Sequence, residues 1–246
     1  MLRHLCVFLL TAFVLSASFR PVPTRSPTAQ TDADTLTAGV FPPKPIVLKG
    51  ATRDLASLDI RLIPLDSGKS LKPSKHDSAG HLLIVKEGTI MVGSKTLGPG
   101  GVGLFETLPP IVGKTNSSFY LFSLKSRAGA DHSRGSILFL ADWSDLAMKS
   151  TPKGESRAIF SLSTAWFKNI NMHATTLNPG EISHPQHMHR AEEILILRSG
   201  NVRMHIANGY VQAKGGDIVF LPSGVPHDLE NGTAGRTEYF ALQWEP

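Results

Sequence analysis

The amino-acid sequence predicts an all-β protein made of two tandem β units. From Ile46 onward, apolar runs of about four to eight residues recur between Gly, Pro, Asn and Asp, a pattern typical of strands joined by tight turns. The 22 Gly and 17 Pro residues also favour many short strands over long helices. A faint internal repeat indicates that one β unit occurs twice.

The predicted strands are rich in β-branched and aromatic residues. The clearest runs are HLLIVKEG, SSFYLFSL, GSILFLADW, EEILILRSG, NVRMHI and GDIVFLPSG. No segment has a convincing helical period, apart from a turn expected near residues 144–149.

The repeat becomes visible when Gly88 is placed over Gly200, which aligns HLLIVKEGTIMV with EILILRSGNVRM. Further along, Gly101 is placed over Gly216. The alignment divides the chain into two β units, residues 46–148 and 149–246, although strand–turn patterns in unrelated β-proteins would give part of this similarity.

The first 18 residues, MLRHLCVFLLTAFVLSAS, have a basic start, an apolar run and small residues at the end. This is the layout of a signal peptide, and the apolar run is shorter than the ~20 residues of a membrane span. We therefore expect export to the periplasm or the extracellular space, with no stable membrane insertion after cleavage. The single cysteine, Cys6, lies in this segment, so the mature protein would contain no disulfide.

Residues 19–45 are rich in Pro, Thr and Ala and poor in large apolar side chains. This composition is typical of a flexible linker.

The formal net charge of +5 and the pI of about 9.4 raise the question of an anionic partner. The basic residues are scattered, and none of them forms a run interleaved with aromatic residues. The sequence therefore predicts no nucleic-acid partner and a mildly basic solvated surface instead.

Four side chains that commonly bind metals fall in two short stretches. In GEISHPQHMHRAEEILILRSG, His187, His189 and Glu193 keep the same parity, so an extended strand would point all three to one face. Two histidines at this spacing can also be a surface pair, but a glutamate bordering an apolar strand favours a buried site. In GDIVFLPSGVPHDLEN, His227 follows a rigid Pro222 and Gly224 turn. Taken alone, His227 could equally be a solvated strand-end histidine.

Together the two stretches resemble the two signature motifs of the cupin superfamily. The first motif fits from His187 to Gly200, but six residues separate Gly180 from His187 where the family has five. The second motif matches at every position from Gly216 to Asn231. The resemblance is strong over about residues 160–246 and weak over 46–148.

The resemblance implies two tandem jelly-roll β-barrels, of which the C-terminal one binds one divalent transition metal ion. It also implies the ligands, which are His187, His189, Glu193 and His227. Three imidazoles and one carboxylate suit Mn, Fe, Zn, Ni, Co or Cu. In the repeat alignment the corresponding residues of the N-terminal unit are Lys75, Asp77, His81 and Val112, so we expect that unit to be degenerate and to bind no metal.

Two more histidines are candidates for the substrate pocket. His173 shares strand parity with Leu177, and His184 lies in the loop that leads to the ligands. Ordinary loop and core roles remain open for both.

The fold does not determine the reaction. We favour an exported metal-dependent enzyme, an oxidoreductase, decarboxylase or hydrolase, acting on a small oxygenated molecule such as a carboxylate or ureide. The alternative is a non-catalytic cupin that binds a metal or ligand for storage, scavenging or sensing. The sequence identifies no catalytic residue beyond the ligands, and it is compatible with a monomer or a homodimer.

Overall fold

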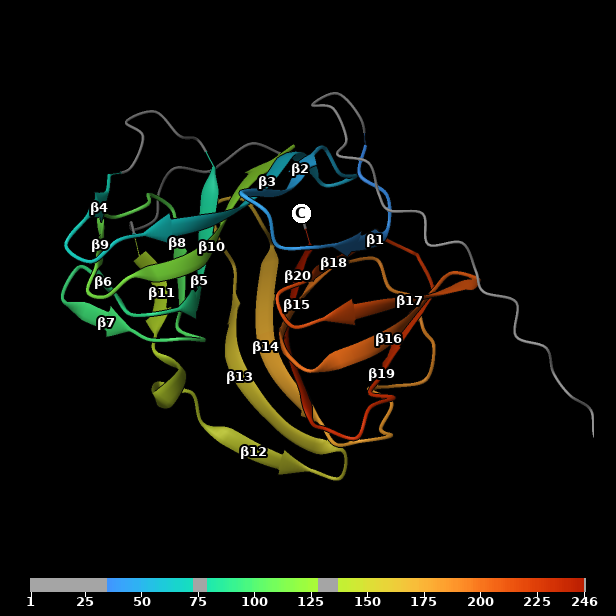
Figure 1. Cartoon of the computed structure of the whole chain (residues 1–246). Coiled ribbons are helices and arrows are strands. Elements are labelled where there is room, and N and C mark those ends of the chain that lie inside the picture. The colour runs from blue at the N-terminus through green and yellow to red at the C-terminus, as the bar shows by residue number, and fades with distance from the viewer. Residues whose placement is uncertain (1–34, 73–78, 128–136, 246) are drawn as a thin grey trace, which may run out of the picture.

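The computed structural model describes residues 35–72, 79–127 and 137–245, and the prediction of an all-β jelly-roll fold is confirmed. The described residues form strands and one short 3-10 helix, η1, at Trp143–Asp145. In Figure 1 the N-terminal half runs from blue to green and the C-terminal half from yellow to red. Within the described residues, no helix has the length and apolar character that crossing a membrane requires. The predicted signal peptide lies outside the described residues.

The C-terminal half contains one large and one small antiparallel sheet, which face each other as the walls of a barrel. The large sheet has the order β1-β18-β15-β20-β14-β13-β12 and the small one the order β17-β16-β19. Their strands are β1 (Gly39–Phe41), β12 (Met148–Thr151), β13 (Gly154–Leu162), β14 (Asn169–Leu177), β15 (Glu192–Ser199), β16 (Asn201–Ile206), β17 (Gly209–Lys214), β18 (Ile218–Leu221), β19 (His227–Glu230) and β20 (Thr237–Glu245).

The N-terminal half repeats this arrangement with sheets of order β11-β8-β5-β10-β3-β2 and β4-β9-β6-β7. Their strands are β2 (Ile46–Gly50), β3 (Leu55–Leu65), β4 (Ser70–Leu71), β5 (Gly80–Glu87), β6 (Ile90–Val92), β7 (Lys95–Leu97), β8 (Val102–Phe105), β9 (Ile111–Gly113), β10 (Ser117–Ser126) and β11 (Ile137–Ala141).

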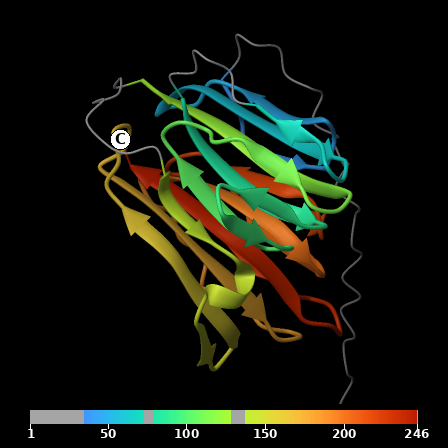
Figure 2. The ribbon, with the colours of Figure 1, turned by 90° about the vertical axis from the view of Figure 1, so that its left-hand side faces the viewer.

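The two large sheets pack face to face, and this contact forms the main core of the molecule. Strand β15 shows the arrangement: Ile194 and Ile196 join the core shared with the N-terminal sheet, whereas Leu195 and Leu197 join the separate core inside the C-terminal barrel. This alternation is the two-residue period of a strand that is buried on both faces. Figure 2 shows the two halves as stacked layers. Each Leu, Ile or Phe buried there contributes about 1.5–3 kcal/mol.

Each half also receives one edge strand from the chain segment that precedes the other half. Strand β1 pairs with β18 of the C-terminal sheet, and β11 pairs with β8 of the N-terminal sheet. The sequence analysis assigned residues 19–45 to a flexible linker, but Gly39–Phe41 is a strand and Leu36 is buried. Composition missed it because a three-residue strand is stabilised by its partner and not by its own propensity.

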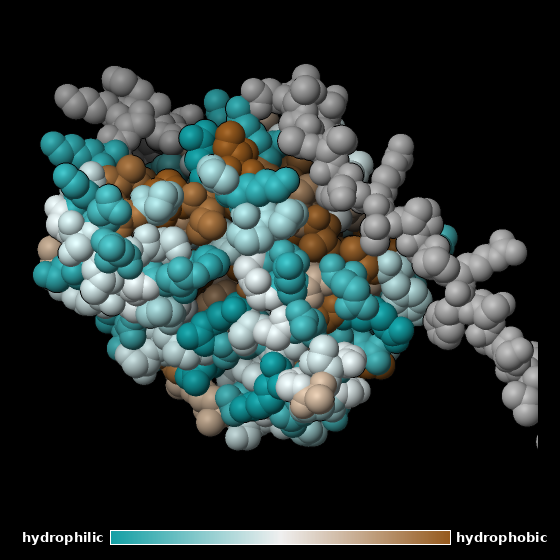
Figure 3. Space-filling model, viewed as in Figure 1, coloured by the Kyte–Doolittle hydropathy of each residue, from teal (hydrophilic) through white to brown (hydrophobic). Residues whose placement is uncertain are grey.

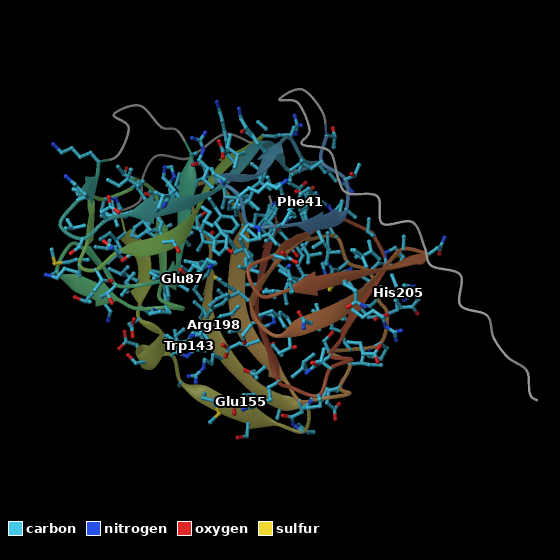
Figure 4. The ribbon with its side chains drawn as sticks, in the orientation of Figure 1. Phe41, Glu87, Trp143, Glu155, Arg198 and His205 are labelled. Atoms are coloured by element: carbon cyan, nitrogen blue, oxygen red, sulfur yellow. The ribbon has the colours of Figure 1, made fainter. Side chains whose placement is uncertain are left out.

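The segment between the halves is held by stacked aromatic and cationic groups. The guanidinium carbons of Arg198 and Arg157 lie 4.1 Å and 4.6 Å from the ring centroid of Trp143. Figure 4 shows Trp143 and Arg198 side by side where the two halves meet. On the face shown in Figure 3 the surface is mostly hydrophilic to neutral, with apolar residues mainly in its upper part.

The predicted repeat has a structural counterpart, with one correction. Gly88 and Gly200 both have positive φ, 72° and 78°, a conformation that favours glycine. In the next turn, however, Gly100 donates to Val85 O as Gly216 donates to Leu197 O, and both glycines have positive φ. The equivalent of Gly216 is therefore Gly100, one residue before the Gly101 of the sequence alignment.

A buried polar network joins the halves behind the predicted ligands. Glu192, 1% exposed, accepts hydrogen bonds from Thr52 Oγ1 at 2.5 Å, the Arg53 amide at 2.9 Å and Trp244 Nε1 at 3.2 Å. Burial raises the pKa of this carboxyl, opposed by the hydrogen bond from Thr52. These donors are needed because a buried carboxyl group without partners is destabilising.

Replacing Thr52 with valine tests this network. Thr52→Val keeps the shape of the side chain but removes the hydroxyl donor to Glu192, so we expect the free energy of unfolding to fall by about 1.5–3 kcal/mol. Urea unfolding measures the change. Thr96→Val, at an exposed site, is the matched control, and an equal effect at both sites would contradict the assigned role.

Candidate metal centre

The four predicted ligands come from two segments that approach across the mouth of the C-terminal barrel. Glu193 is the second residue of β15 and His227 the first residue of β19, while His187 and His189 lie in the irregular segment before β15. The two segments are joined by backbone hydrogen bonds, from the His187 amide to His227 O at 3.1 Å and from the His227 amide to His187 O at 2.9 Å. The extended strand expected for His187 and His189 is absent there, and this backbone bridge aligns them instead.

Glu193 is the centre of the cluster. It is 6% exposed, and its Oε2 atom lies 3.2 Å from His189 Nε2 and 3.2 Å from His227 Nε2. Burial opposes ionisation of the carboxyl, but the contacts with the two histidines outweigh burial and lower its pKa to about 2. Glu193 therefore carries a negative charge inside the barrel wall at neutral pH.

Backbone contacts fix which ring nitrogens face Glu193. Nδ1 of His189 lies 2.9 Å from Ala191 O, and Nδ1 of His227 lies 2.8 Å from Val225 O. Because a carbonyl only accepts, each Nδ1 carries the proton, and in the neutral ring Nε2 presents its lone pair toward Glu193. Such second contacts are typical of histidines that bind metals.

This donor set fits a cation. His227 is 3% exposed, and its Nε2 atom is buried without a hydrogen-bond partner. Two imidazole lone pairs and a carboxylate facing one another repel unless a proton or a metal ion lies among them. With imidazole and carboxylate donors and no thiolate, the cluster suits the divalent transition metals.

His187 and His184 extend the cluster toward solvent. Donor atoms of His189, Glu193 and His227 lie within 4.8 Å of one another, and so do those of His184, His187 and His227. His187 is exposed, and its ring centroid lies 4.8 Å from that of His227 and 5.2 Å from that of His189. The structure therefore brings all four predicted ligands together, with His227 shared between two overlapping groups and His184 added.

The second pocket candidate, His173, lies deeper in the barrel. It pairs with Ala241 on β20, and the parity of β14 turns it to the inner face together with Leu177. Burial lowers the pKa of its imidazole, partly offset by the charge of Glu193. His173 is not part of either group of metal-binding atoms.

Two amides on the same inner face were missed by the sequence analysis. Gln243 pairs with both Glu193 and Asn171 in the sheet, and strand parity places these residues on one face. The sequence analysis named only His173 and His184 as pocket candidates and did not include Gln243. The alternation of β20, in which Phe240, Leu242 and Trp244 join the core between the sheets, is the signal that could have found it.

Asn231 holds the loops beneath the site. It is fully buried, and its Nδ2 atom lies 3.1 Å from Leu177 O, 3.1 Å from Asn178 O and 2.8 Å from Gly235 O. It thereby satisfies carbonyls at the end of β14 and in the turn after β19. An asparagine at this position of the second motif therefore has a structural role.

Comparisons with known proteins support this fold. Residues 173–242 match the family model for a cupin domain. Among solved structures, the chain is similar to AerE from Microcystis aeruginosa, with 14% identity, a TM-score of 0.62, and coverage of 84% of this chain and 99% of that one. None of the curated proteins compared matches the chain.

Two further solved structures resemble the chain at similar levels. One is the putative glyoxylate induced protein from Pseudomonas aeruginosa, with 17% identity, a TM-score of 0.60, and coverage of 76% of this chain and 74% of that one. The other is an S161A mutant of Bacillus subtilis oxalate decarboxylase, with 12% identity, a TM-score of 0.58, and coverage of 78% and 69%. At these identities the likeness concerns the fold. Residues 173–242 match a cupin domain, and the chain has a jelly-roll fold like that of these structures.

Proposed function

We propose that the C-terminal barrel binds one divalent transition metal ion through His187, His189, Glu193 and His227, and that the protein is a metal-dependent enzyme acting on a small oxygenated molecule. One observation carries this proposal, the buried Glu193 carboxylate facing two Nε2 atoms, of which that of His227 has no hydrogen-bond partner. A cation bound there would satisfy all three groups at once.

The side chains at such a site would have two roles, binding the metal ion and orienting the substrate. A bound divalent ion would act as a Lewis acid toward an oxygen of the substrate. Glu193 and His227 are buried and fix the inner side of the site, while the exposed His187 marks the side open to a small molecule. His173, Asn171 and Gln243 line the inner face and offer imidazole and amide groups to orient a carboxylate or ureide.

The similarity to an oxalate decarboxylase favours a carboxylate over a ureide as the first substrate to test. A non-catalytic cupin that stores, scavenges or senses a ligand is the alternative. It predicts stoichiometric binding without product.

We further propose that the chain is a two-barrel cupin whose N-terminal barrel is degenerate. The repeated sheet orders and the reciprocal edge strands β1 and β11 support duplication. Both groups of metal-binding atoms found among the described residues lie in the C-terminal half. His81, the counterpart of Glu193, is buried with its Nδ1 atom 3.3 Å from Ser123 Oγ. Lys75 and Asp77 lie outside the described residues.

We also propose that the protein is exported, since residues 1–18 have the layout of a signal peptide. Fusing residues 1–30 to a reporter that is active only outside the cytoplasm tests this, with residues 19–30 alone as the control.

Metal content is the first test of the proposed centre. We expect one transition metal ion per chain in protein purified without an affinity tag, and none in His227→Ala, because that change removes the buried donor. Elemental analysis measures the content, and circular dichroism checks that the fold persists. His205→Ala is the control, since His205 contacts Tyr210 and Asp228 on the outside of the barrel. A wild type that stays metal-free on titration would overturn the proposal.

Metal affinity should rise with pH. The hydrogen bond to Glu193 raises the pKa of His189 above 6.5, whereas burial and the neighbouring histidines lower that of His187. The proton therefore stays on His189 to a higher pH than on a free imidazole, and affinity should increase as the pH rises through the titration of His189, because the ion must displace that proton. Calorimetric titration with Zn²⁺ in buffers of different ionisation enthalpy measures both effects. Affinity that is independent of pH would be inconsistent with this ligand set.

Turnover distinguishes the enzyme from the binder. We expect metal-loaded protein to convert a member of a panel of small carboxylates and ureides, beginning with oxalate, and the His187→Ala/His227→Ala double variant to lose that conversion while staying folded. Chromatography of the reaction mixture detects the product. Depletion of a compound in proportion to protein, without product, would favour the non-catalytic alternative.

A further inference from the structure

The loop before the ligand histidines contains a bulge. Ile182 pairs with Glu230 and His187 pairs with His227, so the four residues 183–186 face only the two residues 228–229. The two surplus residues cannot join the ladder and must leave its plane. This is the stretch in which the spacing from Gly180 to His187 exceeds the cupin motif by one residue.

The bulge is held at both ends. At its first residue, the Ser183 amide donates to Leu229 O at 2.8 Å, and Lys153 Nζ donates to Ile182 O at 2.7 Å and to Ser183 O at 3.0 Å. At its last residue, Gln186 Nε2 donates to Ala207 O at 3.2 Å. Its shape is therefore defined by contacts on both sides, as expected of a bulge that re-aims a side chain.

The side chain re-aimed by this bulge is His184. Its ring centroid lies 4.0 Å from that of His187 and 6.0 Å from that of His227. Its Nδ1 atom lies 3.1 Å from Pro185 O. This contact assigns the proton to Nδ1, so the lone pair of Nε2 is available to bind a cation.

A second observation is that the same cluster includes the buried Nε2 atom of His227, which has no hydrogen-bond partner. Donor atoms of His184, His187 and His227 lie within 4.8 Å of one another, as close as those of His189, Glu193 and His227. By this measure His184 groups with His187 and His227, two of the four predicted ligands.

We propose that His184 is a fifth protein ligand of the metal centre and that it biases the centre toward Zn²⁺, Cu²⁺ or Ni²⁺ over Mn²⁺. The proposal rests on the proposed metal site. Imidazole is a good ligand for the later transition metals, whereas Mn²⁺ favours carboxylate, carbonyl and water oxygens. A fourth imidazole therefore strengthens binding of the later metals more than that of Mn²⁺.

His184→Phe tests the proposal, because it keeps a flat ring against His187 and removes both nitrogens. Competition titrations give the affinities for Zn²⁺ and Mn²⁺, and X-ray absorption of the Zn²⁺-loaded protein counts imidazole ligands. We expect a loss of Zn²⁺ affinity of at least about tenfold, a smaller loss for Mn²⁺, and one imidazole fewer. His184→Gln, which restores a weaker donor, should recover part of the Zn²⁺ affinity.

Unchanged affinities in His184→Phe would overturn the proposal and leave the four-ligand site intact. Equal losses for both metals with an unchanged imidazole count would also overturn it, because His184 would then only support His187 by packing. A wild type that binds neither ion would instead refute the proposed metal site itself, so the two failures are distinguishable.

Discussion

The two-residue alternation of strand β15 is the constraint on which the rest of the structure depends. Glu192 points into the contact between the sheets and Glu193 into the barrel, and both are buried. Burial raises the pKa of Glu192 among its neutral donors, while the neighbouring imidazoles lower that of Glu193 to about 2. The pKa values of adjacent carboxyl groups thus shift in opposite directions because a strand turns successive side chains to opposite faces. A shift of register by one residue would exchange these environments and destroy both the contact and the site.

The contact between the sheets makes the N-terminal half part of the site. Arg190, next to His189, forms a bidentate ion pair with the buried Asp54, at 2.8 Å and 2.9 Å. One residue beyond, Ala191 accepts the Nδ1 proton of His189, and Glu192 is held by Thr52. The loop of residues 51–54 therefore braces the segment that carries His189 and Glu193 from outside the barrel. Precise placement of ligands depends on such supporting contacts. A half without a metal-binding cluster among its described residues can therefore still support the proposed metal centre.

The sequence predicted the position of a side chain correctly where the residue belongs to a hydrogen-bonded strand. It did not do so where the residue lies in a loop. Strand parity grouped His173 with Leu177, and in the structure both lie on the inner face of β14. Parity could not place His187, since the chain there is irregular and only its backbone bridge to His227 fixes it. The equivalence of Gly100 with Gly216 was missed by one residue because faint similarity gives no register where hydrogen bonds are unknown. Strand β1 was missed because its partner, β18, lies far away in sequence.

The extra residue between Gly180 and His187 says more about the chemistry of this site than the motif positions that match. The matched positions specify a turn, a ladder or a buried donor, as Asn231 and Gly216 do, and such requirements are shared by any barrel of this shape. The extra residue between Gly180 and His187 lies outside these matched positions, and contacts of Lys153 and Gln186 hold this loop with His184 against His187. An ordered bulge costs conformational entropy. If the proposed centre forms, the bulge is explained by the histidine that it presents there, since binding residues are often carried by loops on a rigid scaffold.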